Sequence, residues 1–185
     1  MDEVKKITTP LTKKQIENLK AGDQVLITGV IYSARDAAHK LLVELIDDGK
    51  ELPLDVENQI IYYAGPTPAK PGKVIGSCGP TTSGRMDAYS GKMIELGLKG
   101  MIGKGPRSPE VIESMKENGV VYFAAIGGAA ALIADTIQKV DIVAFPELGP
   151  EAIRRMEVVD YPCIVAIDSQ GNNLYKLGVE QYREA

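Results

Sequence analysis

Short β-branched runs alternate with helical patterns along this chain of 185 residues. Runs rich in Val and Ile between turn residues predict strands. These runs are Gln24–Tyr32, Val74–Cys78, Met101–Gly103, Val120–Ile126 and Val140–Ala144. Apolar residues spaced three and four apart predict helices. These segments are residues 12–20, Ala34–Ile46, Arg85–Lys99, Ser108–Asn118, residues 128–138 and Gly149–Val158. Such alternation is typical of an α/β fold with a mainly parallel sheet.

Capping residues in the sequence mark both ends of one predicted helix. Ser108 followed by Pro109 is a strong start signal, and Gly119 is placed to end the helix. The strand, helix and strand that follow, up to Ala144, are predicted to form a βαβ unit. By contrast, Glu51–Lys73 holds prolines around a short apolar run and is predicted to be a loop.

An antiparallel addition is predicted near the end of the chain. Cys163–Ile167 and Asn173–Tyr175 are expected to pair as a hairpin around the turn Asp168–Asn172. The length suits one domain, and no repeat or linker divides it, so residues 1–185 are expected to fold together.

Composition excludes several classes of protein. A net charge of −4 without any long basic run argues against a nucleic-acid-binding protein. The longest apolar stretch, Val120–Ala134, is short of the roughly 20 residues that a membrane span needs. The first residues lack the apolar core of a secretory signal, so a cytoplasmic protein is expected. Cys78 and Cys163 are too few to ligate zinc or an iron–sulfur cluster, so no metal site is expected within the chain.

The segment Cys78–Asp87, with the sequence CGPTTSGRMD, lies between a predicted strand and a predicted helix. Backbone N–H groups at such a helix start favour an anion, and Arg85 can hold a carboxylate with paired hydrogen bonds. The alternative is a plain strand-to-helix turn, capped by Thr81 or Ser83. A Walker loop is excluded because Gly84 is followed by arginine.

Two further strand ends carry cations. In Ser33–His39, Arg35 follows a strand, Asp36 is placed to cap the next helix, and His39 is the chain's single histidine. A lone histidine inside a helix is more often structural, although its pKa suits proton transfer. In the segment after Met101–Gly103, glycines flank Lys104, so that the backbone can approach a ligand closely or form a solvated turn.

The positions of the three cations are most informative when they are considered together. Arg35, Arg85 and Lys104 each follow a predicted strand, and the carboxyl ends of parallel strands share one edge of a sheet. Three cations with neighbouring hydroxyls suit a small dianionic acid. Removing a proton from carbon next to a carboxylate would require such charge stabilisation. A phosphate- or nucleotide-binding module is a further alternative.

The string CGPTTSGRMD resembles the GPTT-x-GRMD signature of the class I fumarase C-terminal domain, which also occurs as the β subunit of two-chain fumarases and L-tartrate dehydratases. RDAAH, GKG-x-RS and FPELGPEAI resemble other blocks of that family, in the same order. The resemblance covers roughly residues 10–180. It implies a swivelling β/β/α domain with a mainly parallel central sheet and an antiparallel addition. Ser83 and Pro106 depart from the residues that the family often has there.

The resemblance also implies a division of labour. A partner α subunit would carry a [4Fe-4S] cluster, whose free iron polarises a four-carbon dicarboxylate. Thr81 would be the catalytic base, and Arg35, Arg85 and Lys104 would bind the substrate's carboxylates. Asp36, His39 and Asp87 would assist, and Thr82 and Gly84 join the substrate-binding residues. The αβ dimers are expected to pair into a larger assembly.

The expected activity is reversible hydration of fumarate to malate, in a fumarate hydratase whose β subunit is inactive alone. Two alternatives stay open. One is an L-tartrate dehydratase β subunit, because both substrates are four-carbon dicarboxylates. The other is a non-catalytic, dicarboxylate-binding scaffold subunit that only stabilises its partner.

Overall fold

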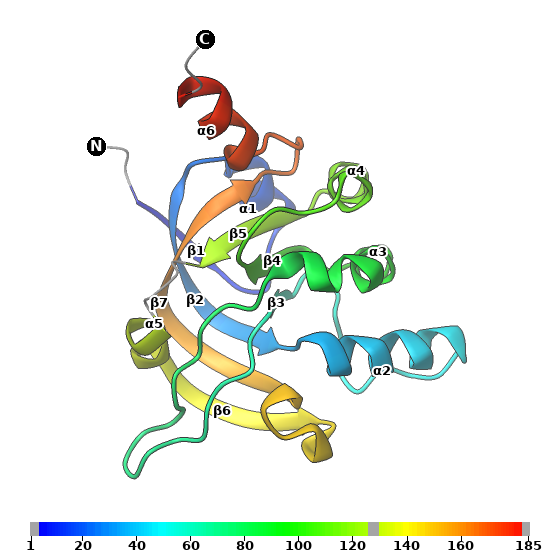
Figure 1. Cartoon of the computed structure of the whole chain (residues 1–185), viewed down its shortest axis with the longest axis vertical. Helices are drawn as coiled ribbons and strands as arrows, with labels where there is room; N and C mark the ends of the chain where they lie inside the picture. The colour runs from blue at the N-terminus through cyan, green and yellow to red at the C-terminus, as the bar shows by residue number, and fades with distance from the viewer. Residues whose placement is uncertain (1–3, 126–129, 183–185) are drawn as a thin grey trace.

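The fold is a mixed α/β arrangement built on one seven-stranded sheet, seen in a computed structural model that describes residues 4–125 and 130–182 (Figure 1). The strands are β1 Lys5–Thr8, β2 Gln24–Ser33, β3 Ile60–Tyr62, β4 Gly100–Gly103, β5 Val121–Ala125, β6 Ile137–Ala144 and β7 Ile153–Ile167. The α-helices are α1 Lys13–Asn18, α2 Asp36–Asp47, α3 Asp87–Glu95, α4 Pro109–Asn118, α5 Ala130–Thr136 and α6 Leu174–Tyr182. Two 3₁₀ helices, η1 Ser83–Met86 and η2 Pro146–Glu151, complete the described elements.

The sheet combines parallel and antiparallel pairing. Strands β1 to β5 pair in sequence order, and all four of these pairings are parallel. Strand β7 runs antiparallel to β2, β5 and β6. Because β2 and β7 pair with each other as well, the sheet curls so that β3, β4 and β5 bridge from β2 to β7. This confirms a mainly parallel sheet with an antiparallel addition.

The bridging strands are buried on both faces, which creates two cores. Side chains of β3 to β5 point alternately to opposite sides, as the period of two in a strand requires. One set, including Tyr62, Ile102 and Phe123, packs inside the curled sheet against β2 and β7. The other set, including Ile61, Met101 and Tyr122, packs against helices α2, α3 and α4. The result is three layers: helices α2 to α4, the bridging strands β3 to β5, and the antiparallel part of the sheet with β2, β7 and β6.

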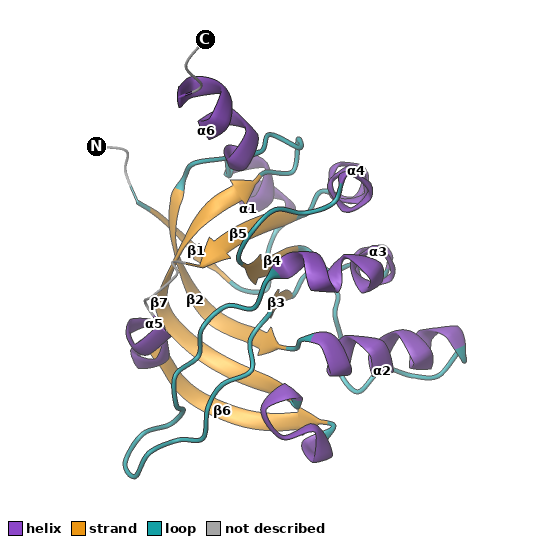
Figure 2. Cartoon of the chain, viewed as in Figure 1, coloured by secondary structure: helices purple, strands orange, loops and turns teal. Residues whose placement is uncertain are grey.

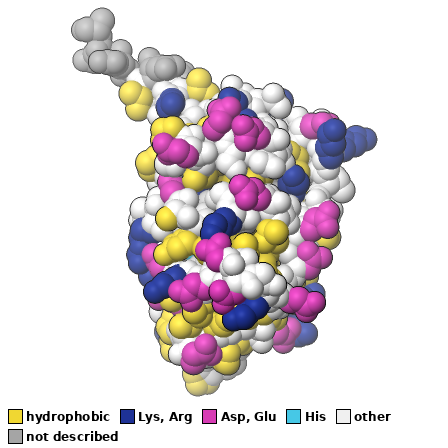
Figure 3. All heavy atoms as spheres, turned by 90° about the vertical axis from the view of Figure 1, so that its right-hand side faces the viewer, with side chains coloured by type: hydrophobic (Ala, Val, Ile, Leu, Met, Phe, Trp, Pro, Cys, Tyr) yellow, Lys and Arg dark blue, Asp and Glu magenta, His cyan; other side chains and the backbone are white. Residues whose placement is uncertain are grey.

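Helices α2, α3 and α4 lie side by side over the outer face of the bridging strands (Figure 2). Helix α6 lies at the top of Figure 1, beyond the end of β7. No helix among the described residues is both long enough and apolar enough to cross a membrane. On the helical side of the molecule, Lys and Arg side chains are interspersed with Asp and Glu (Figure 3).

Helix boundaries that rest on capping signals are confirmed. Thr12 and Gln15 form a capping box at the start of α1. The Ser108 hydroxyl accepts a hydrogen bond from the Val111 N–H at 3.3 Å at the start of α4. Gly119 ends that helix with φ of 63°, a left-handed conformation that glycine adopts at low cost.

The predicted strand Val74–Cys78 is wrong. Its backbone bonds back to the same loop, since the Gly76 N–H donates to the Thr67 carbonyl and the Thr67 N–H donates to the Ser77 carbonyl. Val74 is 50% exposed, whereas Ile75 and Cys78 pack into the core inside the curled sheet without strand pairing. The whole segment between β3 and η1 therefore forms a long loop that descends beside β6 and returns (Figure 2).

The predicted helix Gly149–Val158 is also wrong. Gly149 has φ of 58° and Pro150 follows it, so the 3₁₀ helix η2 ends at Glu151. The β-branched residues after it enter the long strand β7, where pairing with β2 and β6 outweighs the helical spacing. The predicted strand Asn173–Tyr175 is wrong as well. Only Asn173 bridges to Ile167, and α6 begins at the next residue.

Smaller differences follow from short or irregular elements. Strands β1 and β3 were not predicted, and β3 is the apolar run inside the expected loop. The expected helix Arg85–Lys99 is divided into η1 and α3. Strands β5 and β6 run in the same direction, but β7 lies between them, so the βαβ unit does not close on adjacent strands. Ile126 and the predicted start of the following helix lie outside the described residues.

Candidate active site

The candidate site lies where three neighbouring parallel strands end. Arg35 follows β2, Tyr63 follows β3 and Lys104 follows β4. Because β3 pairs in parallel with both β2 and β4, these residues share one edge of the sheet. The prediction that cations gather at strand ends is therefore confirmed for Arg35 and Lys104, whereas Arg85 arrives there by another route.

The segment Thr81–Arg85, called the Thr81 loop below, lies between the ends of β3 and β4 like a short extra strand. The Thr81 N–H donates to the Tyr63 carbonyl at 2.6 Å, and the Lys104 N–H donates to the Thr81 carbonyl at 3.3 Å. The Ser83 N–H then donates to the Lys104 carbonyl at 2.9 Å. Backbone bonds on both sides thus hold Thr81, which is 9% exposed, while Thr82 and Gly84 are exposed.

Ser83 anchors this loop from below. Its side chain is fully buried, and its Oγ lies 2.9 Å from the Tyr122 hydroxyl. The same hydroxyl lies 2.8 Å from the Gly105 carbonyl, to which it donates, so it can accept the Ser83 proton. A Cβ at Gly103 would overlap Ser83 Oγ, which explains why glycine ends β4. The loop is therefore seated directly on the sheet.

Two arginines and two carboxylates form a connected cluster at this edge. Arg85 Nε donates to Asp36 Oδ1 at 2.8 Å, and Arg35 Nε lies 3.3 Å from Asp36 Oδ2. Arg35 Nε also lies 3.3 Å from Glu151 Oε1. Each arginine uses only its Nε here, and within residues 4–125 and 130–182 no hydrogen bond occupies the terminal Nη groups of either one. Those ends suit an external carboxylate.

The start of α2 stabilises the charges of this cluster. Asp36 lies in the first turn of the helix, and the Ala37 N–H donates to Glu151 at 3.1 Å. Burial would raise the pKa of Asp36, but its backbone hydrogen bond and the two arginines together lower it. Asp36 is therefore ionised at neutral pH and positions both guanidinium groups. The expectation that it caps α2 is not met by a side-chain bond, because Arg35 occupies the cap position.

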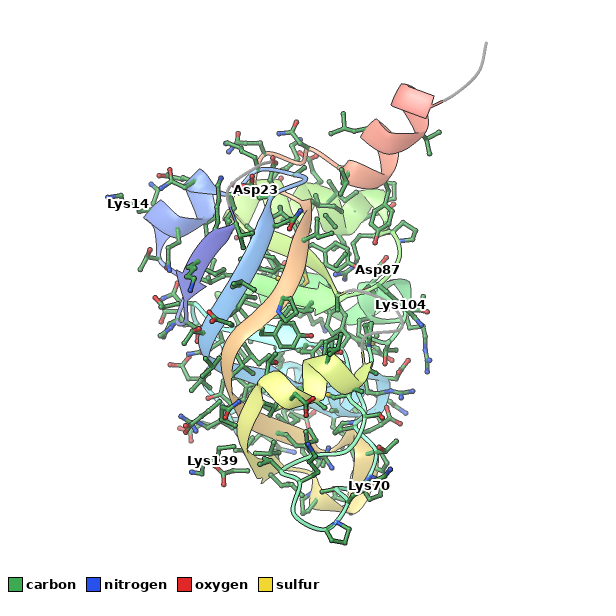
Figure 4. All side chains as sticks on the ribbon, turned by 90° about the vertical axis from the view of Figure 1, so that its left-hand side faces the viewer. Lys14, Asp23, Lys70, Asp87, Lys104 and Lys139 are labelled. Carbon is green, nitrogen blue, oxygen red and sulfur yellow. The ribbon has the colours of Figure 1, made fainter. Side chains whose placement is uncertain are left out.

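Lys104 contributes its backbone to the loop and leaves its side chain exposed. In the part of the chain that the structure describes, no carboxylate lies within 4.0 Å of its amino group. Figure 4 labels Lys104 and Asp87 on the same side of the molecule. Its charge is thus available to a ligand at the strand ends.

His39 lies beneath the cluster and is fully buried. Its Nδ1 lies 3.0 Å from the Arg35 carbonyl, and its ring packs against Tyr63 and Tyr89. Burial, assisted by the charge of Arg107, lowers the pKa of His39 to about 4, although the carbonyl and Asp36 oppose this. His39 is therefore neutral at pH 7 and supports the backbone of Arg35 from inside.

This burial predicts a pH dependence of stability. The unfolded chain protonates His39 near its ordinary pKa of 6.5, whereas the folded chain does so only near 4. Between these values the unfolded state binds more protons, so the free energy of unfolding falls as pH drops, by up to about 1.4 kcal/mol per pH unit. Urea unfolding at several pH values should show a flatter dependence for His39→Gln. If the free energy of unfolding depends on pH with the same slope in both proteins, the lowered pKa of His39 is contradicted.

Comparison with known proteins decides the family. The sequence model described as "Fumarase C-terminus" matches residues 2–178. The chain belongs to this family. A Methanocaldococcus jannaschii protein, provisionally named L(+)-tartrate dehydratase subunit beta, is 44% identical over 90% of this chain and 88% of its own length. The anaerobic class I fumarate hydratase of Escherichia coli is 41% identical, and fumarate hydratase 2 of Leishmania major is 40% identical.

These relatives differ in length. The chain corresponds to nearly all of the M. jannaschii subunit, but it spans only 30% of the E. coli enzyme and 29% of the L. major enzyme. Within the fumarase C-terminus family, therefore, the same region occurs both as a separate subunit and as part of a longer chain.

The cysteines of this family member do not form a metal site. Cys78 and Cys163 are buried in the core inside the curled sheet. Burial raises the pKa of Cys78 to about 12, partly opposed by Arg154, and raises that of Cys163 further. Neither thiol is poised as a thiolate ligand. Among the described residues, no group of three His, Cys, Asp or Glu side chains is arranged to hold a metal ion. These residues do not fit an iron–sulfur cluster.

Two residues of the site had no role assigned from sequence. Glu151, the last residue of η2, reaches Arg35 from within the segment Gly149–Val158, which was wrongly predicted to be a helix. Arg107 is 5% exposed and lies beneath the Thr81 loop. Both stand in sequence blocks that resemble the family, FPELGPEAI and GKG-x-RS, and that position was the available signal. Asp87 pairs with Arg107 rather than with the exposed cations.

Proposed function

We propose that this chain is the β subunit of an iron–sulfur hydro-lyase that acts on a four-carbon dicarboxylate. The observation that carries the proposal is the pair Arg35 and Arg85, held by Asp36 through their Nε atoms with their Nη ends unoccupied in the described part of the chain. The family of the chain supports the reaction type, since its relatives are named fumarate hydratase or tartrate dehydratase.

The arginines would bind and orient the substrate. A guanidinium group can donate two parallel hydrogen bonds to a carboxylate, which fixes both position and angle. Two guanidinium groups, both held by the Asp36 carboxylate, match the two negative charges of a dicarboxylate. Lys104 would add a third positive charge at the end of β4. The exposed Thr82 and Gly84 would line the same approach.

Thr81 would transfer the proton. In hydration, a hydroxide group adds to one carbon of the double bond and a proton adds to the other. Thr81 would deliver that proton and recover it in the reverse direction. Its backbone is fixed on both sides, which fixes the point from which its side chain projects. A threonine hydroxyl is a weak base on its own, so neighbouring groups or the partner chain must activate it.

The remaining chemistry is assigned to a partner α subunit. A [4Fe-4S] cluster on that subunit would supply a Lewis acid for the substrate's hydroxyl and carboxylate. We place this assembly in the cytoplasm, with αβ dimers paired into a larger complex. We also assign the layered fold to the swivelling β/β/α type, in agreement with the two cores described above.

Fumarate is the first substrate to test, and L-tartrate is the second. The full-length match to a subunit named for tartrate dehydratase favours tartrate. The several relatives named fumarate hydratase favour fumarate. Supplying each acid in turn to the assembled complex separates the two, with absorbance following the loss of fumarate in one assay and the formation of the 2-oxo acid from L-tartrate in the other. Turnover of neither acid would contradict the proposal.

The rival function is a non-catalytic, dicarboxylate-binding scaffold subunit that only stabilises its partner. It predicts that substitutions at Arg35, Arg85 and Lys104 reduce assembly with the partner while each assembled complex turns over normally. The unoccupied donor groups of Arg35 and Arg85 among the described residues suit a dicarboxylate under either function. The relatives' names, tartrate dehydratase and fumarate hydratase, favour catalysis. Complex yield and turnover per complex, measured on the same preparations, distinguish the two.

A further inference from the structure

We infer that Arg107 is a positioning residue of the active site, a buried cation that fixes the Thr81 loop without touching substrate. This inference rests on the proposed function. The Arg107 side chain has no exposed surface. Burying a charge is costly unless it is paired and hydrogen-bonded, and an apolar residue of similar size often fills such a place equally well. The sequence nevertheless places an arginine here.

The guanidinium group uses its whole fork. Its Nε donates to Asp87 Oδ1 at 2.7 Å, and its Nη2 donates to Ser90 Oγ at 2.6 Å. Its Nη1 lies 3.4 Å from the Tyr63 hydroxyl and 3.2 Å from Met101 Sδ. These bonds run in fixed, coplanar directions, which a lysine amino group cannot reproduce.

The aromatic neighbours provide the first link to the loop. The guanidinium carbon lies 5.4 Å from the centre of the Tyr63 ring and 5.2 Å from that of the Tyr122 ring. The Tyr63 carbonyl accepts the Thr81 N–H, and the Tyr122 hydroxyl bonds to Ser83. Arg107 therefore contacts Tyr63 and Tyr122, the two residues that hydrogen-bond to the two ends of the segment Thr81–Ser83.

The hydrogen bonds of Arg107 provide a second link. The Ser90 hydroxyl, which accepts from Arg107, donates to the Met86 carbonyl at 2.8 Å and so fixes the end of η1. The Asp87 carboxylate, bonded to Arg107, also accepts the Ser108 N–H at 2.8 Å. Arg107 is thus linked to the loop through Tyr63 at its start, Tyr122 in its middle and Ser90 at its end.

The test uses Arg107→Lys, which keeps the charge, and Tyr122→Phe, which keeps the ring but removes its bond to Ser83. Both variants are assayed in the assembled complex. A displacement of about 1 Å can reduce turnover by roughly 100-fold. We expect kcat to fall about 10- to 100-fold in Arg107→Lys, and less in Tyr122→Phe, with a smaller change in KM, because Asp36 still holds Arg85 and Arg35.

A second measurement does not depend on activity. Hydrogen exchange in the full chain should become at least about tenfold faster at the amides of Thr81, Ser83 and Lys104, whose bonds define the loop. Amides within the β2–β7 pairing should be unchanged. Arg155→Lys is the matched control, since Arg155 bonds to Glu157 and not to the cluster.

The outcomes separate the two proposals. Normal kcat per assembled complex and unchanged loop exchange in both variants would overturn the positioning role, even if the melting temperature falls. Faster exchange with normal kcat would also overturn it, because the loop would then move without consequence for the reaction. An inactive wild-type complex would refute the proposed function instead.

Discussion

Replacing Thr81 with alanine is expected to lower kcat of the assembled enzyme by at least about 100-fold, because a positioned proton-transfer group contributes roughly 10²- to 10⁴-fold. KM should change little, because the proposed carboxylate-binding side chains, Arg35 and Arg85, are still present. The backbone bonds of residue 81 to Tyr63 and Lys104 do not involve its side chain, so the loop should keep its shape. Steady-state kinetics of the complex measure both constants.

Two controls make the Thr81 result specific. Thr81→Ser keeps the hydroxyl and should retain much more turnover than Thr81→Ala. Thr67→Ala removes a threonine from the exposed loop between β3 and η1, outside the cluster, and should behave as wild type. A Thr81→Ala complex that turns over at the wild-type rate would remove Thr81 from the proton transfer.

Replacing Arg85 with lysine is expected to raise KM for the dicarboxylate about tenfold or more. Hydrogen bonds to charged groups contribute roughly 1.5–3 kcal/mol each, and about 1.4 kcal/mol corresponds to a tenfold change in affinity. Lysine keeps the positive charge but cannot form the paired bonds of a guanidinium group. Because the Arg85 side chain is 52% exposed and bonds only to Asp36 among the described residues, the fold should tolerate the change.

The matched substitution Arg155→Lys controls for loss of an arginine elsewhere on the chain. It should leave KM unchanged, because Arg155 pairs with Glu157 on β7. Thermal melting of both variants checks that stability is equal. A KM for Arg85→Lys equal to that of wild type would show that Arg85 does not bind the carboxylate.

The fold was predictable wherever local signals and tertiary packing agree. The capping signals at Thr12, Ser108 and Gly119 located helix ends because they satisfy backbone groups within a few residues. Predictions failed where partners distant in sequence decide the structure. The residues after Glu151 follow a helical spacing, yet they pair with β2 more than a hundred positions earlier. No local pattern contains that pairing.

The site was predictable as a set of residue types at strand ends, but its connections were not. The positions of Arg35 and Lys104 followed from the parallel strands. The bond from Asp36 to Arg85 joins residues 49 positions apart, and the salt bridge from Glu151 to Arg35 spans 116 positions. The burial of Arg107 could not be expected either, because arginine is almost never buried unless paired, and its partner Asp87 was not identified.

The division of catalysis between two chains is the central claim to test. The decisive measurement is a titration of this chain into a fixed amount of the cluster-bearing partner, with fumarate and L-tartrate hydro-lyase activity recorded in separate series. We expect no turnover by either chain alone, and a rate that rises and saturates near one chain per partner. Robust turnover by this chain alone, or a partner fully active without it, would contradict the account.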